Sequence, residues 1–213
     1  MYETHIGMIY GFIGPIGGGK THQLELLRKR NKEILCPFIT GDFSDGIRQT
    51  VLNLFGCDGL KINASSGYYL EWKNKEQLFD IPIGDYGRHV PIKGRELLKN
   101  IGEGLKDLAG QDVWARWTLS DICKQYQSLP NDNRKQECDV AFGSIRFKDE
   151  AQAVFDASEM LEKQVNLIFC NFHEVKYDPD VHVSESLAHK LISLGYKDED
   201  DVTQAVKEIY NIK

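Results

Sequence analysis

Four short and nearly continuous runs of apolar residues predict buried strands in this chain. The runs are Ile6–Ile13, Glu33–Thr40, Cys138–Ile145 and Val165–Asn171. Continuous apolar character, without regular alternation with polar positions, is typical of parallel strands that are covered on both faces. We therefore predict that the four runs form one parallel sheet.

Apolar positions three and four residues apart predict helices between and after these strands. In the stretch after the second run, for example, Ile47, Val51 and Phe55 recur at every fourth position. The alternation of strands and helices predicts an α/β fold, with a parallel sheet flanked by helices. The expected helices are Lys20–Lys32, Ser44–Phe55, Gly94–Leu108, Lys148–Lys163, Ser184–Leu194 and Asp200–Tyr210.

Residues 41–137, between the second and third predicted strands, are too many for a simple crossover connection. We expect them to form an inserted helical subdomain within one domain that covers residues 1–213. An irregular piece, Gly56–Pro91, is rich in Gly, Asn, Asp and Tyr, and its end, Gly84–Pro91, is a candidate hinge. Aromatic residues are dense in the insertion, where they could form a stacking wall for a nucleobase or simply the core of the subdomain. These residues are Tyr68, Tyr69, Trp72, Phe79, Tyr86, Trp114 and Trp117.

Composition excludes several classes of protein. Hydrophobic residues make up 41% and charged residues 27%, which is typical of a globular protein and not of a disordered or collagen-like chain. The formal net charge is -6 and no long basic run occurs, so we expect no binding to a nucleic-acid polymer. We also expect no membrane span and no signal peptide. The five cysteines form no C-x-x-C pair, and their odd number fits reduced thiols in the cytoplasm. The sequence leaves a homodimer open.

The most specific motif is Gly14-Pro-Ile-Gly-Gly-Gly-Lys20-Thr21, which matches G-x-x-x-x-G-K-[ST] between the first predicted strand and the first helix. In such a loop, the backbone N–H groups and the helix N-terminus surround a phosphate group. Lys20 would reach the β- and γ-phosphates, and the Thr21 hydroxyl could hold Mg²⁺. The spacing does not fit a dinucleotide fold. The motif therefore predicts a nucleoside triphosphate site, made of Gly14, Pro15, Ile16, Gly17, Gly18, Gly19, Lys20 and Thr21.

Cationic residues in the insertion suggest a second phosphate site. Arg48 lies on one expected helix, and Arg95 lies at the N-terminal end of the next, where the helix dipole also favours an anion. Two such arginines could hold a phosphomonoester between them. For Lys99 and Lys106, on the same helix as Arg95, we favour a solvated surface.

Four further motifs carry a resemblance to a known family. Phe43-Ser-Asp-Gly-Ile-Arg48 with Leu54-Phe-Gly56 is similar to F-A-D-P-L-K … L-F-G, and Lys93-Gly-Arg-Glu-Leu-Leu-Lys-Asn-Ile-Gly-Glu103 with Trp114 is similar to T-x-R-E-L-L-Q-x-x-G-T … W. Ser144-Ile-Arg-Phe-Lys-Asp-Glu-Ala151 is similar to D-V-R-F-P-N-E-A, and His182-Val-Ser-Glu185 to H-x-S-E. With the phosphate loop, these motifs follow the order found in the deoxynucleoside monophosphate kinases of tailed phages and related viruses, which the chain resembles from residue 14 to 185.

The resemblance implies a P-loop kinase that transfers the γ-phosphoryl group of ATP, with Mg²⁺, to a deoxynucleoside monophosphate (dNMP). Its substrates would be small molecules, and a viral source would place it in the host cytoplasm. By the same resemblance, Arg48, Arg95 and Trp114 fall where contacts with the acceptor are expected. Arg146 falls near the transferred phosphoryl group, so Lys20 and Arg146 are the predicted catalytic residues.

Two motifs raise questions about individual residues. Ser144 replaces the aspartate that ends the third strand in the family. We expect Thr21 to bind the metal and Ser144 to orient a water molecule beside it. Because one negative charge is missing, we expect free Mg²⁺ to bind weakly. Asp139 lies about five residues, or ~16 Å, away at the other end of that strand and is too far to substitute. In His182-Val-Ser-Glu185, we favour Ser184 as a helix N-cap and Glu185 as a complement to the helix dipole over contact with nucleotide.

Two other functions are consistent with the phosphate loop. One is a kinase whose acceptor is a phosphomonoester other than a nucleotide, as in the phosphomevalonate kinases, although the aromatic residues of the insertion favour a nucleotide. The other is a nucleotide-binding scaffold without catalytic activity.

Overall fold

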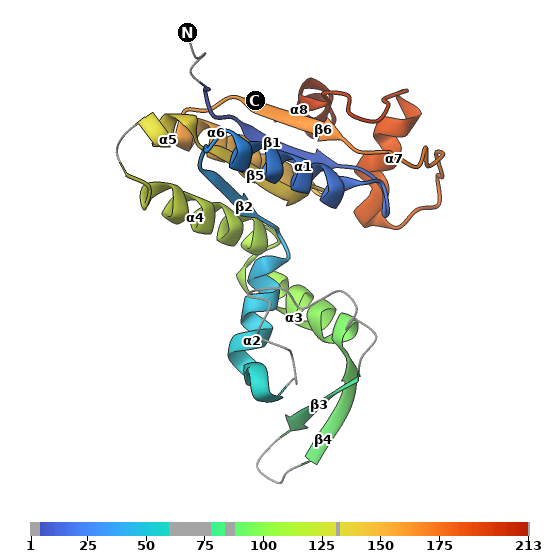
Figure 1. Cartoon of the computed structure of the whole chain (residues 1–213). Coiled ribbons are helices and arrows are strands. Elements are labelled where there is room, and N and C mark those ends of the chain that lie inside the picture. Colours follow the sequence, from blue (N-terminus) through green and yellow to red (C-terminus); the bar gives the residue numbers. More distant parts are fainter. Residues whose placement is uncertain (1–4, 60–77, 84–87, 131–132, 213) are drawn as a thin grey trace. The chain divides into compact units, whose positions relative to one another are not determined.

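The chain forms two compact units, seen in the computed structural model of Figure 1. The first contains residues 1–43 and 115–213, and the second contains residues 44–114. The structure describes residues 5–59, 78–83, 88–130 and 133–212, with the backbone alone for residues 52, 54–59, 78–83, 88–91, 95, 133 and 134.

The first unit is built on a four-stranded parallel sheet with strand order β2-β5-β1-β6. Strand β1 lies at the centre, with Gly11 opposite Phe142 of β5 on one side and opposite Leu167 of β6 on the other. The strands are β1 (Ile9–Ile13), β2 (Phe38–Gly41), β5 (Asp139–Ser144) and β6 (Val165–Phe169). All four predicted strands are present, and the α/β fold with a parallel sheet flanked by helices is confirmed.

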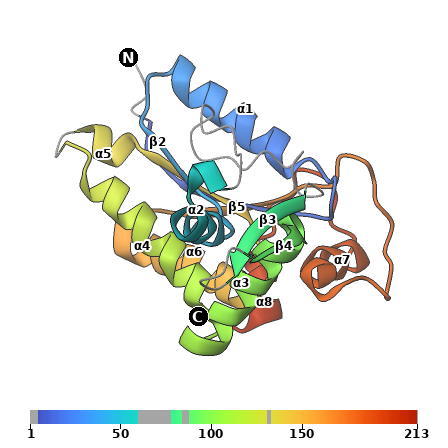
Figure 2. The ribbon, with the colours of Figure 1, turned by 90° about the horizontal axis from the view of Figure 1, so that it is seen from below.

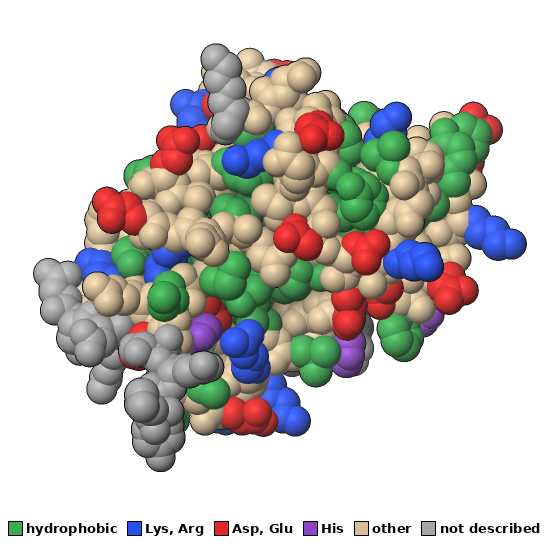
Figure 3. Space-filling model, turned by 90° about the horizontal axis from the view of Figure 1, so that it is seen from above, with side chains coloured by type: hydrophobic (Ala, Val, Ile, Leu, Met, Phe, Trp, Pro, Cys, Tyr) green, Lys and Arg blue, Asp and Glu red, His purple; other side chains and the backbone are tan. Residues whose placement is uncertain are grey.

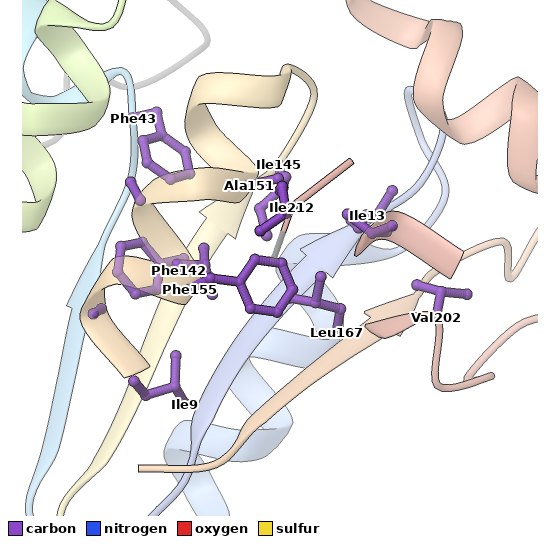
Figure 4. Close-up of a cluster of buried hydrophobic side chains, with 14 of the residues drawn as sticks. Ile9, Ile13, Phe43, Phe142, Ile145, Ala151, Phe155, Leu167, Val202 and Ile212 are labelled. Carbon is purple, nitrogen blue, oxygen red and sulfur yellow. The ribbon is translucent and has the colours of Figure 1, made fainter. Parts of the chain in front are cut away.

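Helices cover both faces of this sheet, as Figures 1 and 2 show for α1 on one face and for α4 and α6 on the other. Tyr10 and Phe12 of β1 pack with Leu27 of α1, whereas Ile9 and Ile13 point into the larger core on the opposite face. Figure 4 shows part of that core. The helices of this unit are α1 (Lys20–Glu33), α4 (Val113–Gln127), α5 (Asn133–Glu137), α6 (Lys148–Leu161), α7 (Ser186–Ser193) and α8 (Thr203–Tyr210).

The second unit consists of α2 (Asp45–Gly59), the antiparallel hairpin of β3 (Leu78–Ile83) and β4 (Arg88–Lys93), and α3 (Gly94–Ala109). Val51 of α2 and Leu97 of α3 are buried together in its core. Our expectation of irregular structure throughout Gly56–Pro91 was therefore wrong. Both strands contain a proline, and proline argues against a strand in the centre of a sheet. In a two-stranded hairpin both strands are edge strands, and edge strands tolerate proline.

Two boundaries also differ from the sequence prediction. The second unit is shorter than the insertion expected at residues 41–137, because most of α4 packs into the core of the first unit through residues such as Ala115 and Ile122. Strand β2 begins at Phe38 and not at Glu33, because α1 extends to Glu33 and Leu35 then adopts a left-handed φ of 59°.

The surface carries charges of both signs, and in the view of Figure 3 acidic and basic side chains are interspersed. A bilayer-spanning helix is absent from the described residues, since no helix there pairs sufficient length with an apolar composition.

Candidate phosphate-binding site

The phosphate loop, residues Gly14–Thr21, connects the carboxyl end of β1 directly to the first turn of α1. Gly18 N–H donates to the Pro15 carbonyl at 2.9 Å, which closes a turn inside the loop. Gly17 and Gly19 have φ values of +77° and +97°, and Gly19 is the N-cap of α1. Side chains strongly disfavour this conformation, so the loop needs glycine at these two positions. The local structure is the strand, turn and helix that the motif predicts.

Lys20 lies across its own loop. Its Nζ donates to the carbonyl oxygens of Gly14, at 2.5 Å, and Pro15, at 2.8 Å. Burial lowers the pKa of the Lys20 ammonium, Glu185 counteracts this, and the positive charge of Arg146 lowers the pKa further. The structure therefore brings the two predicted catalytic cations, Lys20 and Arg146, into electrostatic reach of each other.

The backbone of Arg146 is held from two sides just beyond the end of β5. Its N–H donates to Glu150 Oε2 at 2.6 Å, and its carbonyl accepts from the Tyr210 hydroxyl at 3.2 Å. Within the described part of the chain, the buried Arg146 Nε has no hydrogen-bond partner. A buried guanidinium N–H costs free energy unless it is bonded, and an anionic oxygen would supply the missing acceptor.

Glu185 is a site residue that the sequence analysis did not identify. It is 9% exposed, and its Oε2 accepts a hydrogen bond of 2.7 Å from the Ile16 N–H within the phosphate loop. It ends the short 3₁₀ helix η3 (Val183–Glu185), which His182 caps by accepting from the Ser184 N–H. Our expectation that Ser184 caps the following helix was wrong, because Glu185 is the N-cap residue of α7. The H-x-S-E motif was the available signal, and we had favoured a capping role for it.

The two residues predicted to serve a metal lie in the same unit. Thr21 is exposed in the first turn of α1, and Ser144 is half-buried at the carboxyl end of β5, paired with Phe12 of β1. Among the described residues, no three His, Cys, Asp or Glu side chains form a group able to hold a metal ion. Nucleotide-bound Mg²⁺ does not need such a group, because phosphates and water fill most of its coordination sites. The roles of Thr21 and Ser144 stay predictions.

The second unit contains the residues predicted to bind the acceptor. Arg48 is 5% exposed, and its Nη1 donates to Asp45 Oδ1 at 2.7 Å within α2. Trp114 is 6% exposed, and its indole N–H donates to the Gly102 carbonyl at 3.0 Å. These contacts give both side chains a packing role, and their contact with an acceptor stays a prediction.

Other predicted residues are described by the backbone alone or lie outside the described residues. For Arg95 the structure describes the backbone alone, at the start of α3. For Phe79, too, the structure describes the backbone alone. Residues Tyr68, Tyr69, Trp72 and Tyr86 are not described, nor are residues 84–87 of the hinge expected at Gly84–Pro91.

Comparison with known proteins adds little to this geometry. No protein-family model matches the chain. No curated protein matches it in sequence. Among solved structures, the chain is similar to a mutant of the Mycobacterium tuberculosis APS kinase CysC, with 13% identity, a TM-score of 0.33, and coverage of 89% of this chain and 97% of that one. A TM-score this low carries no argument about function.

Proposed function

We propose that the protein is an ATP-dependent kinase that phosphorylates a nucleoside monophosphate, specifically a 2′-deoxynucleotide, to give the diphosphate. The observation that carries the phosphotransferase part of this proposal is the pair of cations at the phosphate loop. Lys20 and Arg146 supply positive charge beside a loop conformation suited to phosphate, and the buried Nε of Arg146 has no hydrogen-bond partner among the described residues.

The chemistry needs no nucleophilic side chain. An oxygen of the acceptor phosphate attacks the γ-phosphoryl group in line, while the bond from the γ-phosphorus to the bridging oxygen breaks and ADP leaves. Catalysis consists of positioning and charge stabilisation. Lys20 would leave the Gly14 and Pro15 carbonyls to contact the β- and γ-phosphates. Arg146 would stabilise charge on the transferred group. Mg²⁺, when bound, would neutralise phosphate charge beside Thr21 and Ser144.

The choice of a deoxynucleotide acceptor depends on the resemblance of the sequence motifs. The motif that contains Arg48 forms the start of α2, where Asp45 and Arg48 pair. We propose that this pairing presents Arg48 to the acceptor phosphate together with Arg95 of α3. The expected result of Arg48→Ala or Arg95→Ala is a KM for the acceptor at least about tenfold higher, with the KM for ATP nearly unchanged. A change confined to the KM for ATP would contradict this assignment.

The deciding experiment measures ADP release with a panel of deoxynucleoside monophosphates, ribonucleoside monophosphates and phosphomevalonate. ATP binding is measured in parallel by calorimetry. Turnover of a deoxynucleotide supports the proposal. Turnover of phosphomevalonate alone would show that the acceptor is a phosphomonoester other than a nucleotide. Retained ATP binding without turnover of any acceptor would favour a nucleotide-binding scaffold.

A further inference from the structure

The carboxyl end of β5 has a neutral residue at the position where the family resemblance leads one to expect an aspartate. Its last two residues are Gly143 and Ser144, and Ser144 lies opposite Phe12 of β1, two residues before the phosphate loop. Strand β5 therefore brings a hydroxyl, and not a carboxylate, next to the nucleotide site. A carboxylate for the metal would have to come from a neighbouring element.

The neighbouring strand β2 brings such a carboxylate to the same edge of the sheet. Gly41 is the last residue of β2 and pairs with Phe142, so Asp42 emerges beside Gly143. The side chain of Asp42 lies directly against this glycine, because a Cβ added at Gly143 would be 2.5 Å from Asp42 Oδ2 and 3.1 Å from its Cγ. The absence of a side chain at position 143 therefore makes room for the Asp42 carboxylate beside Ser144.

Packing fixes Asp42 in this place. The Asp42 carbonyl accepts a hydrogen bond of 3.4 Å from the hydroxyl of Thr118, which is 1% exposed. The next residue, Phe43, is 2% exposed and stacks on Phe142 of β5, with ring centroids 5.7 Å apart. The half-buried Asp42 side chain thus extends from a backbone anchored on both sides. Such an anchor favours a defined position at a functional site.

We propose that Asp42 takes the place of the missing β5 aspartate by accepting hydrogen bonds from water bound to the Mg²⁺ of the nucleotide. Magnesium keeps several of its waters in protein sites, and a carboxylate has enough lone pairs to hold more than one of them. The Ser144 hydroxyl, beside Gly143, can orient a further water. This inference depends on the nucleotide site of the proposed function, and it is independent of which acceptor the enzyme uses.

The test measures metal binding apart from activity. Binding of a non-hydrolysable ATP analogue is first measured in EDTA, and Mn²⁺ is then titrated into the protein–analogue complex by electron paramagnetic resonance. Asp42→Asn is expected to raise the Kd for Mn²⁺ about tenfold and to leave analogue binding in EDTA unchanged. The matched control is Asp156→Asn on α6, which removes the same charge and should leave both constants unchanged.

Two further variants make the test specific. Gly143→Ala should raise the Kd for Mn²⁺ as Asp42→Asn does, because the added Cβ displaces the carboxylate. Ser144→Asp in the Asp42→Asn background should restore tight Mn²⁺ binding, because it returns one charge to the same edge. Thermal melting checks the fold of each variant, and Asp42→Ser replaces Asp42→Asn if the latter does not fold.

The outcomes separate this inference from the proposed function. Tight analogue binding with an unchanged Kd for Mn²⁺ in Asp42→Asn would overturn the role of Asp42 alone. Failure of the wild-type protein to bind the analogue would overturn both.

Discussion

The two ends of the sheet in the first unit each carry charged side chains, but they use them differently. At the amino end, the fully buried Asp139 accepts from the Met8 N–H at 2.8 Å, from Asn31 Nδ2 at 3.0 Å and from the His5 ring at 3.2 Å. At the carboxyl end, Lys20 and Arg146 are cations close enough for one to lower the pKa of the other. A buried charge surrounded by donors stabilises a fold, whereas neighbouring like charges are favourable only when an anion joins them.

The buried cations at the two ends of the sheet differ in whether the protein itself supplies a hydrogen-bond partner. Lys163, at the amino end, is 7% exposed and donates to the Gln136 carbonyl at 2.9 Å, so this buried cation also has a partner from the protein. At the carboxyl end, the buried Arg146 Nε lacks one among the described residues. We therefore expect substitutions of Asp139 or Lys163 to change stability, and substitutions of Lys20 or Arg146 to change ligand binding and catalysis.

The largest expected effect is that of Lys20→Ala. Loss of a charge contact formed in the transition state should lower kcat on the order of 100-fold or more. The free energy of unfolding should change little without nucleotide, because the hydrogen bonds of Lys20 to the described residues go to two carbonyls of its own loop. The matched control is Lys29→Ala on the same helix, an exposed lysine 4.0 Å from Glu33, which should keep full activity. A folded Lys20→Ala variant with near wild-type kcat would remove the phosphate loop from the mechanism.

The second effect belongs to the amino end. Asp139→Ala should lower the free energy of unfolding by about 3 kcal/mol, measured by urea denaturation, because it leaves buried donors without an acceptor. Asp139→Asn should cost less, because Asn31 Oδ1 has no partner among the described residues and can turn toward the new amide. If Asp139→Ala instead abolished phosphoryl transfer in a protein of normal stability, the two ends would not be independent.

Sequence reasoning predicted the first unit well because its strands and helices have strong, separate patterns. β1, β5 and β6 are rich in apolar residues, and the glycine-rich loop has its motif in the expected place. The hairpin of the second unit was missed because Pro82 and Pro91 lie in paired strands. Proline in a sequence argues against a strand. In addition, strands that lie outside the main sheet do not show the continuous apolar run that marks a buried strand.

The site was predicted less completely than the fold. Lys20 and Arg146 belong to local motifs, so the sequence was enough to find them. The contact of Glu185 with Ile16 joins residues 169 positions apart, and the contact of Asp42 with Gly143 depends on strand order. Neither long-range contact leaves a pattern in one sequence, although the H-x-S-E motif marked Glu185 as worth attention.

The third prediction concerns pH and the anchor of Arg146. Glu150 is 7% exposed, and its Oε2 accepts from the N–H groups of Arg146 and Phe147. Burial raises the pKa of the Glu150 carboxyl to about 7, against an ordinary value of 4.5. The folded state therefore holds this proton more tightly than the unfolded state, so this group's stabilisation is complete below pH 4.5 and is lost as the pH rises to about 7.

Glu150→Gln should remove this pH dependence, because glutamine keeps an acceptor oxygen but does not titrate. The change in the wild-type free energy of unfolding across this window should be roughly 1–3 kcal/mol from Glu150. Urea denaturation at several pH values between 4.5 and 8 measures it. Equal pH slopes for wild type and Glu150→Gln would show that this carboxyl does not titrate in that range.

The smallest effect is expected at Glu185, and it separates a hydrogen bond from a charge. The Glu185 carboxylate holds the Ile16 N–H at 2.7 Å, and it also lies close enough to raise the pKa of Lys20. Glu185→Ala frees the phosphate loop from this anchor and should weaken ATP binding about three- to tenfold, since one charge-assisted hydrogen bond is lost. Glu185→Gln keeps an acceptor for Ile16 and removes only the negative charge, so its ATP affinity should stay within about threefold of wild type.

Calorimetry measures the Kd for ATP of both variants, with Glu159→Ala, which removes an exposed carboxylate on α6, as the control. An equal loss in Glu185→Gln and Glu185→Ala would mean that the charge of Glu185, and not its bond to the loop, supports nucleotide binding.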